Sequence, residues 1–465
     1  MGEALQVIAI VGRPNVGKST LFNSLIRQRK AIVGDRPGVT VDRLESEWRL
    51  GERKVTLVDT GGIGQEDSGD APEQRDMQSC IEQQVEAALD VADLVMFVVD
   101  GEAGLTPVDQ SVADKLRRQN MNVVLVVNKA EKPDMAAEFF SLGMGDPVAV
   151  SALHGQGIRQ LREMLDQRLP KKESSEQGVS DIPANHIIAR LAVIGRPNVG
   201  KSTLINAWLG RERMVVSSKA GTTRDAVDVD MPYVDKSVDR ESEGVVRLVD
   251  TAGQRRHARI SDVIEFVARV KAQQAFARAD AAMLLLDGSE GVAEQDMRLM
   301  GLAQEKGCAL LVAVNKVDLL DDEAWKRYAE RLDFRMRGLA DIPVFRIAAK
   351  QSKGVKGLLK HAVQAARRNR ITLNTGELNR WLTIAQEKQQ PPSDGGAAVR
   401  MKYCTQVSTA PPAIKIFCNR PKAVKKTYRR YLERDFRKRF NLPGVPVRLE
   451  FSATDNPYGG RGKGH

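Results

Sequence analysis

The string Gly-Arg-Pro-Asn-Val-Gly-Lys-Ser-Thr occupies residues 12–20 and recurs without change at residues 195–203. Each copy follows a short apolar run, at 7–11 and at 191–194, that predicts a buried parallel strand. An amphipathic stretch typical of a helix follows each copy. A G-x-x-x-x-G-K-[ST] string between a strand and a helix predicts a phosphate-binding loop. One match could be an ordinary glycine-containing turn, but two identical copies in this setting argue strongly against that alternative.

Every residue of the two strings is a candidate nucleotide-binding residue. They are Gly12, Arg13, Pro14, Asn15, Val16, Gly17, Lys18, Ser19 and Thr20, and Gly195, Arg196, Pro197, Asn198, Val199, Gly200, Lys201, Ser202 and Thr203. Glycines let such a loop turn its N–H groups inward, where they form a nest for phosphate oxygens with the N-terminus of the next helix. We expect Lys18 and Lys201 to bridge the β- and γ-phosphates, and the hydroxyls of Ser19 and Ser202 to hold Mg2+.

Three further motifs follow each loop in the same order, which indicates that a whole domain is duplicated. In the first half they are Asp59-Thr60-Gly61-Gly62, Asn128-Lys129-Ala130-Glu131 and Ser151-Ala152. In the second half they are Asp250-Thr251-Ala252-Gly253, Asn315-Lys316-Val317-Asp318 and Ala348-Ala349.

The first of these motifs, D-x-x-G, is that of a nucleotide-dependent switch. The carboxylates of Asp59 and Asp250 can hold Mg2+ through water, and the N–H of the last glycine can sense the γ-phosphate. Loss of that phosphate lets the following segment relax, which is the basis of a two-state switch.

The N-K-x-D motif reads the base. Asp318 can accept two hydrogen bonds from guanine, and leaving its carboxylate unpaired against adenine would cost about 1–3 kcal/mol per lost contact. Glu131, one methylene longer, stands at this place in the first half and leaves the base specificity of that site open. Ala348 stands where the first half has Ser151, and we expect the N–H of Ala349 to meet the guanine O6.

Apolar strands alternate with helical patterns between the motifs, for example at 81–89, 94–99 and 108–116. This rhythm predicts an α/β fold, a parallel sheet with helices on both faces and a nucleotide at the carboxyl ends of the strands. The predicted segments are duplicated domains at 1–169 and 186–370, a flexible linker at 170–185, an α+β domain at 371–455 and a disordered tail at 456–465.

The net charge of +11 belongs to the last 95 residues, because residues 371–465 hold 18 Lys+Arg and 7 Asp+Glu. A localised basic domain favours RNA as a partner. We predict helices at 377–389 and 422–440 and strands at 401–407, 413–417 and 447–451. The candidate RNA contacts lie on the second helix and are Lys425, Lys426, Arg429, Arg430, Arg437 and Lys438. The alternative is an ordinary solvated charged face.

Several classes of protein are disfavoured. No apolar run approaches the roughly 20 residues of a membrane span, and the amino terminus lacks the pattern of a secretory signal. The four cysteines are far apart without C-x-x-C spacing, which argues against zinc and disulfides and fits a reducing cytoplasm. We expect a cytoplasmic monomer that binds neither membrane nor DNA.

With these motifs the chain resembles the translation-type GTPases of the Era and TrmE branch. Two such domains followed by a basic KH-like domain are similar to the double-Era GTPase family, called EngA or Der. At the carboxyl end the resemblance includes Pro411-Pro412, Phe417, Asn419, the block 428–432 and Gly444-Val445-Pro446. It implies a GTP-hydrolysing switch in the maturation of the large (50S) ribosomal subunit, whose GTP or GDP state controls docking on ribosomal RNA.

The resemblance also implies roles for individual residues. Thr40 and Thr223 look like the threonines that complete Mg2+ coordination when GTP is bound. Asn15 and Asn198 look like the asparagines that can hold K+ beside the phosphates, where the cation would assist Lys18 and Lys201 as the catalytic groups. Turnover without a partner is then slow, on the order of 10^-4 to 10^-2 per second.

Some residues depart from the family pattern. Val41 stands where the family usually has arginine, and Gln254 stands where Ras-like enzymes place a water-orienting glutamine. Within residues 371–465, the G-x-x-G string expected between two helices of an RNA-gripping KH domain occurs only in the tail, at 459–462. Two other functions stay open: an RNA-binding scaffold in which one nucleotide site is only structural, and a general NTPase that works on RNA structure.

Overall fold

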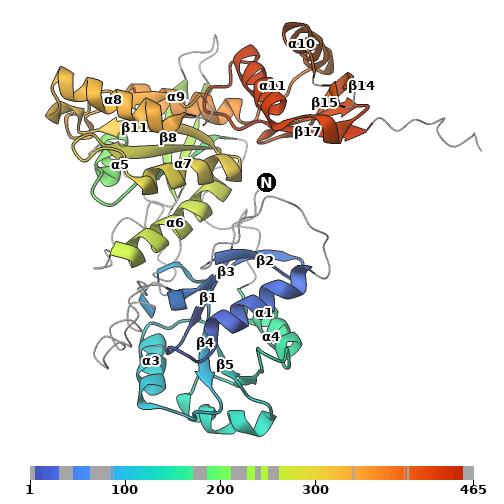
Figure 1. Cartoon of the computed structure of the whole chain (residues 1–465). Helices are drawn as coiled ribbons and strands as arrows, with labels where there is room; N and C mark the ends of the chain where they lie inside the picture. The colour runs from blue at the N-terminus through green and yellow to red at the C-terminus, as the bar shows by residue number, and fades with distance from the viewer. Residues whose placement is uncertain are drawn as a thin grey trace, which may run out of the picture. The chain divides into compact units, whose positions relative to one another are not determined.

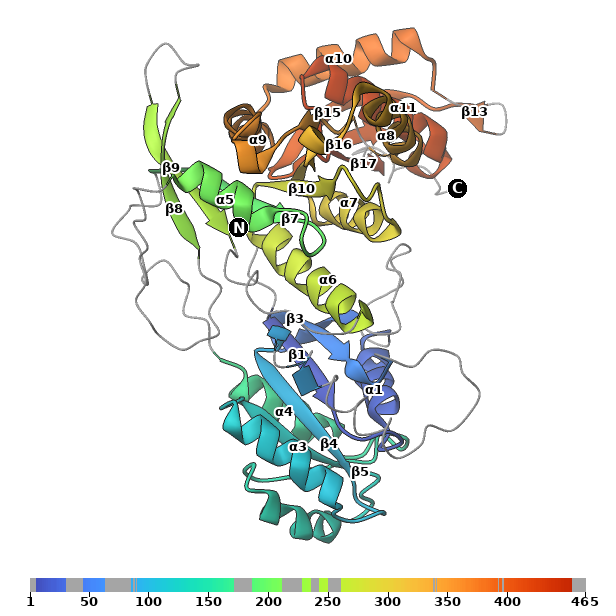
Figure 2. The same cartoon turned by 90° about the vertical axis from the view of Figure 1, so that its left-hand side faces the viewer.

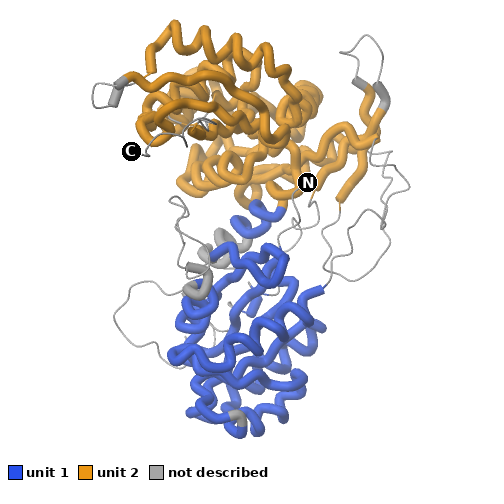
Figure 3. The backbone as a smooth tube through the Cα atoms, turned by 90° about the vertical axis from the view of Figure 1, so that its right-hand side faces the viewer, with its two compact units in different colours: residues 1–177, 256–274 blue, residues 178–255, 275–465 orange. Residues whose placement is uncertain are grey.

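A computed structural model describes most of the chain. The described residues are 6–30, 45–62, 85–86, 88, 90–170, 186–210, 228–235, 242–249, 261–337, 339, 341–391, 393–394 and 397–453. They form parts of two compact units, residues 1–177 with 256–274 and residues 178–255 with 275–465 (Figure 3). The bounds of the five segments expected from the sequence stay a prediction, and residues 171–185 and 454–465 lie outside the described residues.

The first unit contains a six-stranded sheet in the order β2-β3-β1-β4-β5-β6 (Figure 1). Its elements are β1 (Gln6–Val11), α1 (Lys18–Lys30), β2 (Glu45–Leu50), β3 (Arg53–Asp59), η1 (Thr60–Gly62), β4 (Leu94–Asp100), α3 (Pro107–Arg118), β5 (Val123–Asn128), η2 (Pro133–Leu142), β6 (Val148–Ala149) and α4 (Ile158–Arg168). All neighbouring strands are parallel except β2 and β3, which are antiparallel.

Burial on both faces explains why the central strands are continuous apolar runs. Every residue of β1, β4 and β5 is buried. Alternate residues of β1 enter different clusters: Ile8 packs with Leu21 of α1 and Leu161 of α4, whereas Ala9 packs with Val112 of α3. The predicted sheet with helices on both faces is therefore confirmed, and the carboxyl ends of its strands carry the motifs.

The second unit repeats this sheet in the order β8-β9-β7-β10-β11-β12. Its elements are β7 (Ile187–Ile194), α5 (Lys201–Leu209), β8 (Val229–Asp235), β9 (Ser242–Val249), α6 (Ser261–Arg278), β10 (Ala281–Asp287), α7 (Glu294–Lys306), β11 (Ala309–Asn315), η5 (Val317–Leu319), α8 (Asp322–Met336), β12 (Val344–Arg346), η6 (Ala349–Gln351) and α9 (Val355–Arg368). Again only the edge pair, β8 with β9, is antiparallel. The duplication read from the sequence is thus a duplication of topology.

The same unit ends in a three-stranded sheet with two helices (Figure 2). Its elements are α10 (Thr375–Lys388), β13 (Ser393–Asp394), β14 (Ala397–Ala398), β15 (Met401–Thr409), β16 (Pro412–Cys418), η7 (Pro421–Ala423), α11 (Lys426–Arg439) and β17 (Arg448–Ala453). Strand β16 pairs antiparallel with β15 and parallel with β17. The two helices meet at Trp381 and Phe436, whose ring centroids lie 4.8 Å apart, edge to face.

The helix predicted at 422–440 is shorter than expected. Residues Pro421–Ala423 form a separate 3-10 turn, Val424 is extended, and α11 begins only at Lys426. Val424 is 4% exposed and packs into the core from this extended link. A buried apolar side chain at helical spacing therefore misled the prediction, because periodicity does not separate a core residue on a helix from one that precedes it.

No helix among the described residues combines the length and the apolar character needed to cross a bilayer.

Two candidate nucleotide-binding sites

In both domains the phosphate-binding loop touches the base-reading motif at one glycine. Gly17 has φ +89°, and a Cβ added to it would lie 2.3 Å from Nδ2 of Asn128. Gly200 repeats this with φ +98° and 2.3 Å to Nδ2 of Asn315. A residue with a side chain would be strained by its backbone and would displace the asparagine, so only glycine fits here.

The asparagine of N-K-x-D joins three loops in each domain. Asn128 donates from Nδ2 to the carbonyl of Val16 at 2.8 Å and accepts at Oδ1 from the N–H of Ala152 at 3.0 Å. Asn315 makes the equivalent bonds, at 2.8 and 2.9 Å, to Val199 and Ala349. Both amides are buried. The phosphate loop, the base loop and the S-A loop therefore form one hydrogen-bonded unit.

The loop lysine is held at two points in each site. Nζ of Lys18 donates to the carbonyls of Gly12 and Arg13 at 2.6 and 2.9 Å. Nζ of Lys201 makes the same two bonds in its own loop at 2.8 and 2.7 Å. Burial lowers the pKa of Lys201 to about 8. These bonds fix each ammonium group over its loop, which is the placement that phosphate oxygens require.

Asp59 links the first phosphate loop to the D-x-x-G turn. Its Oδ2 accepts from the hydroxyl of Ser19 at 2.7 Å, and its Oδ1 accepts from the N–H of Gly61 at 2.8 Å. The hydroxyl of Thr60 anchors the turn on the carbonyl of Ile10 at 2.6 Å. A carboxylate beside a hydroxyl at this distance is a donor set that suits Mg2+.

Other metal and switch candidates lie outside the described residues. They are Thr40, Thr223, Asp250, Thr251, Ala252 and Gly253, so their predicted roles stay predictions.

The N–H of Ala349 donates to Oδ1 of Asn315 at 2.9 Å and so helps to hold the base-reading asparagine. Its contact with the guanine O6 stays a prediction. The change from Ser151 to Ala348 leaves the loop intact because its pairing is made by backbone groups. Ser151 bridges Gln156, and Ala348 bridges Lys353 in the same way.

Comparisons with known proteins assign these sites to a family. A family model described as 50S ribosome-binding GTPase matches residues 7–129 and 190–316. A second, described as the C-terminal KH-domain-like part of EngA bacterial GTPase enzymes, matches residues 372–452. The GTPase Der of Chromobacterium violaceum is 41% identical over 456 residues, which are 97% of this chain and 92% of the relative. The chain belongs to the GTPase Der family.

Two further Der relatives match over similar lengths. That of Cupriavidus taiwanensis is 39% identical and that of Solidesulfovibrio magneticus 41% identical, each over 97% of this chain and 98% of the relative. As a Der-family protein the chain is a GTP-hydrolysing enzyme with two G domains, and the resemblance drawn from its motifs is confirmed.

In each G domain an aspartate that sequence reasoning missed positions the lysine of N-K-x-D. Nζ of Lys129 donates to Oδ2 of Asp100 at 2.7 Å, and Lys316 pairs likewise with Asp287. Burial alone would raise the pKa of Asp100, but hydrogen bonds from the lysine and from two backbone N–H groups outweigh it and hold the pKa below its usual range. An aspartate-glycine pair directly after a buried strand in both halves was the available signal.

The two base loops differ at their last residue. Asp318 is exposed and accepts from Nε2 of Gln351 at 3.1 Å. Glu131 is exposed and has no hydrogen-bond partner among the described residues. The carboxylate of the second site is thus held in place, whereas that of the first is free to move.

A second missed contact anchors the phosphate loop itself. Nε of Arg13 lies 3.4 Å from Oδ1 of Asp109, which is 1% exposed at the start of α3. Nε of Arg196 lies 3.3 Å from the fully buried Asp296 at the start of α7, and Arg196 also pairs with Glu290 at 3.1 Å. The carbonyl of each arginine is one of the two groups that hold the loop lysine. The buried aspartate therefore supports the lysine through the arginine.

We expect Asp109→Asn to weaken GDP binding at the first site about tenfold, because the substitution removes the charge that holds Arg13. The equivalent Asp296→Asn should weaken GDP binding at the second site less, about threefold, because Arg196 still forms its ion pair with Glu290. Titration of fluorescent GDP checks this, with the other site disabled by its lysine-to-alanine change. Equal losses in the two sites would contradict the explanation.

Two predicted RNA contacts of α11, Arg429 and Arg437, are partly buried. Arg429 donates to the carbonyl of Val424 at 3.1 Å, and its guanidinium lies 4.6 Å from the ring centre of Phe451. Arg437 is half-buried, and burial lowers its pKa despite the nearby charges of Glu433 and Asp341. Helical spacing predicted on which face of the helix these two arginines lie, but not which residues pack against that face. The four remaining candidates are exposed, namely Lys425, Lys426, Arg430 and Lys438.

Proposed function

We propose that this chain is a GTP-driven switch in the maturation of the large (50S) ribosomal subunit, and that its nucleotide state controls docking on ribosomal RNA. The observation that carries the proposal is the single hydrogen-bonded unit of phosphate loop, base loop and S-A loop, present twice. The family model that matches both G domains is described as 50S ribosome-binding GTPase, which supports the same ribosomal partner.

Hydrolysis is the attack of water on the γ-phosphate of GTP. Lys18 and Lys201 neutralise the negative charge that develops on the phosphate oxygens during this step, and the bonds that hold each ammonium group on its loop support this role. We assign no side chain as general base. Because catalysis relies on charge stabilisation without a general base, turnover of the isolated protein is slow, and binding to the ribosome is the step that accelerates it.

The residues present fit two cations. Ser19 and Asp59 offer a hydroxyl and a carboxylate 2.7 Å apart for Mg2+, which lowers the negative charge of the phosphates when bound. Asn15 and Asn198 are both left-handed, with φ +65° and +60°, and both are exposed. Neither amide has a hydrogen-bond partner among the described residues, which leaves its oxygen available for K+.

The C-terminal domain is the part that meets RNA. The whole net charge of the chain resides in this domain and the tail that follows it, and the exposed lysines and arginines of the domain can contact phosphates. We further propose that the protein acts in the cytoplasm as a monomer.

Co-sedimentation with isolated ribosomal subunits tests this function. The protein should pellet with large subunits in a non-hydrolysable GTP analogue, and less with GDP or with small subunits. Raising salt from 50 to 200 mM should weaken the complex steeply, because phosphate contacts release counterions. Equal pelleting in both nucleotide states would contradict nucleotide control, and no pelleting in either would contradict the ribosomal role.

A further inference from the structure

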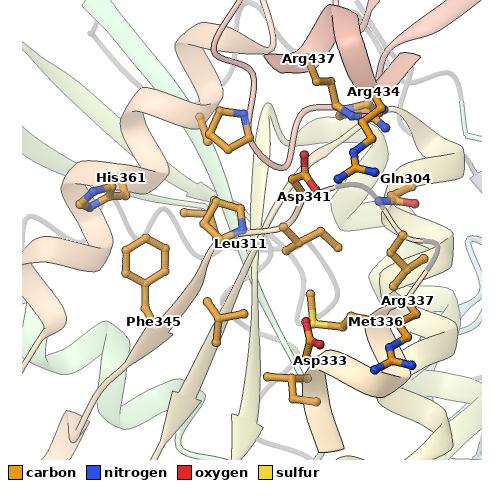
Figure 4. Close-up of a pocket in the computed structure, with 18 of the residues that line it drawn as sticks. Gln304, Leu311, Asp333, Met336, Arg337, Asp341, Phe345, His361, Arg434 and Arg437 are labelled. Carbon is orange, nitrogen blue, oxygen red and sulfur yellow. The ribbon is translucent and has the colours of Figure 1, made fainter. Parts of the chain in front are cut away.

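A groove with a volume of about 1290 Å3 lies inside the second unit, between the second G domain and the C-terminal domain (Figure 4). One wall comes from α8, β12 and α9 and the other from α11. Backbone bonds fix the two walls together: the N–H of Leu310 donates to the carbonyl of Gly444 at 2.9 Å, and the N–H of Gly444 donates to the carbonyl of Asp341 at 2.7 Å. Gly444 has φ +70°, and a Cβ on it would lie 2.2 Å from the oxygen of Leu310. The groove is therefore a fixed feature of this unit.

Positive charge from both walls surrounds the groove. Its arginines are Arg337, Arg346 and Arg368 of the G domain and Arg430, Arg434 and Arg437 of α11, against three acidic residues, Asp333, Asp341 and Glu433. Within the described part of the chain, no carboxylate lies within 4.0 Å of any of the six guanidinium groups. Figure 4 shows Arg434 and Arg437 above the groove and Arg337 at its lower rim.

The lack of ion pairs sets these arginines apart from others in the same unit. Arg247 pairs with Asp230 at 2.7 Å, Arg278 pairs with Asp228, and Arg370 pairs with Asp280. Nε of Arg437 is buried without a hydrogen-bond partner among the described residues. Guanidinium groups without a carboxylate partner keep their N–H donors available for an anion such as a phosphate.

Planar side chains lie beside the charges on the G-domain wall. The rings of Phe345 and His361 are 4.8 Å apart, and His361 is exposed. The guanidinium of Arg346 lies 4.4 Å over the ring of Trp325. Cations for phosphates next to planar groups for bases are the combination that single-stranded nucleic acid requires. An acidic peptide would use the charges but not the planar surfaces.

We propose that this groove binds a single-stranded RNA segment, with phosphates on Arg337, Arg430 and Arg434 and a base against His361. The proposal rests on the ribosomal function above and deepens it, because it places the RNA on both domains of the unit rather than on the C-terminal domain alone. Bound RNA would then contact α8 of the second G domain directly, which gives that domain a physical connection to the ribosome.

Charge reversals with matched controls test the groove. Arg434→Glu changes α11 inside the groove, and Arg439→Glu changes an exposed arginine of the same helix that does not line it. Arg337→Glu and Arg335→Glu form the equivalent pair at the end of α8. The probe is a fluorescein-labelled 12-nucleotide oligouridylate, titrated with full-length protein by anisotropy at several KCl concentrations. Thermal unfolding verifies that each variant is folded.

We expect Arg434→Glu and Arg337→Glu each to raise the Kd for the oligonucleotide about tenfold at 0.1 M salt. The slope of log Kd against log salt should fall by about 0.7 for each lost phosphate contact. Arg439→Glu and Arg335→Glu should change Kd by less than about twofold, because exposed charges outside the site are screened.

Three results would contradict the proposal that this groove binds single-stranded RNA. Equal weakening by the groove variants and their controls would mean diffuse attraction to a basic surface. An unchanged Kd with Arg337→Glu would mean that the C-terminal domain binds RNA alone. Tighter binding of a labelled 12-residue oligoglutamate than of the oligonucleotide would mean an acidic protein partner. In each case co-sedimentation of the wild-type chain with large subunits decides separately whether the ribosomal function stands.

Discussion

Replacing Lys201 with alanine is expected to lower GTP hydrolysis at the second site about 10^3-fold, and Lys18→Ala should do the same at the first. Each ammonium group is held between two loop carbonyls at 2.6–2.9 Å, so its charge is in place before the reaction begins. Losing one preorganised charge of this kind costs about 3–4 kcal/mol of transition-state stabilisation. Single-turnover hydrolysis of labelled GTP by both variants and by the double variant gives the measurement.

The comparison also separates an enzyme with two active sites from a scaffold with one. Each single variant should keep only the rate of the intact site, and the double variant should keep almost none. Lys356→Ala, on the exposed side of α9, is the control for loss of a surface charge. If either loop variant hydrolyses GTP as fast as the wild-type chain, that site contributes no turnover, and the scaffold alternative is correct.

Exchanging K+ for Na+ should lower turnover at least about tenfold, because the smaller cation fits the same oxygens less well and the developing charge is then less stabilised. Asn15→Ala and Asn198→Ala should each remove the K+ dependence of one site. The rates are compared at equal ionic strength, in chains whose other site is disabled by its lysine-to-alanine change.

Replacing these asparagines also changes the backbone, and this second effect requires a control. Asn15 and Asn198 both have a left-handed backbone conformation, in which alanine is strained whether or not a cation is bound. Asn441, with φ +52° and an exposed side chain, is left-handed far from either loop in the sequence, so Asn441→Ala measures strain alone. Equal hydrolysis in K+ and Na+ by the wild-type chain would contradict the potassium proposal.

The sequence predicted the central strands of the two G-domain sheets well but not their edge strands. Strands such as β4 and β11 are buried on both faces, so their composition alone marks them. The edge strand β2, Glu-Ser-Glu-Trp-Arg-Leu, has only two apolar residues, Trp48 and Leu50, so its composition does not mark it as a strand. It is a strand because it pairs with β3 in a hairpin, and this pairing depends on the folded sheet rather than on the local sequence.

Prediction of the sites was limited in the same way: it found residues that are close in sequence and missed residues that only the fold brings together. Contiguous strings identified the loops, because their chemistry depends on residues close in sequence. Asp109 and Asp296 escaped notice because they act on arginines about a hundred positions away. The groove arginines are also distant from one another in sequence, and only packing of α11 against the second G domain brings them to one place.

The amide bridge between Asn128 and its glycine restricts what evolution can alter. A change at Gly17 displaces the amide, and a change at the amide releases both neighbouring loops, so neither position can drift alone. Both G domains have this contact, so the same steric restriction holds independently at Gly17 and at Gly200.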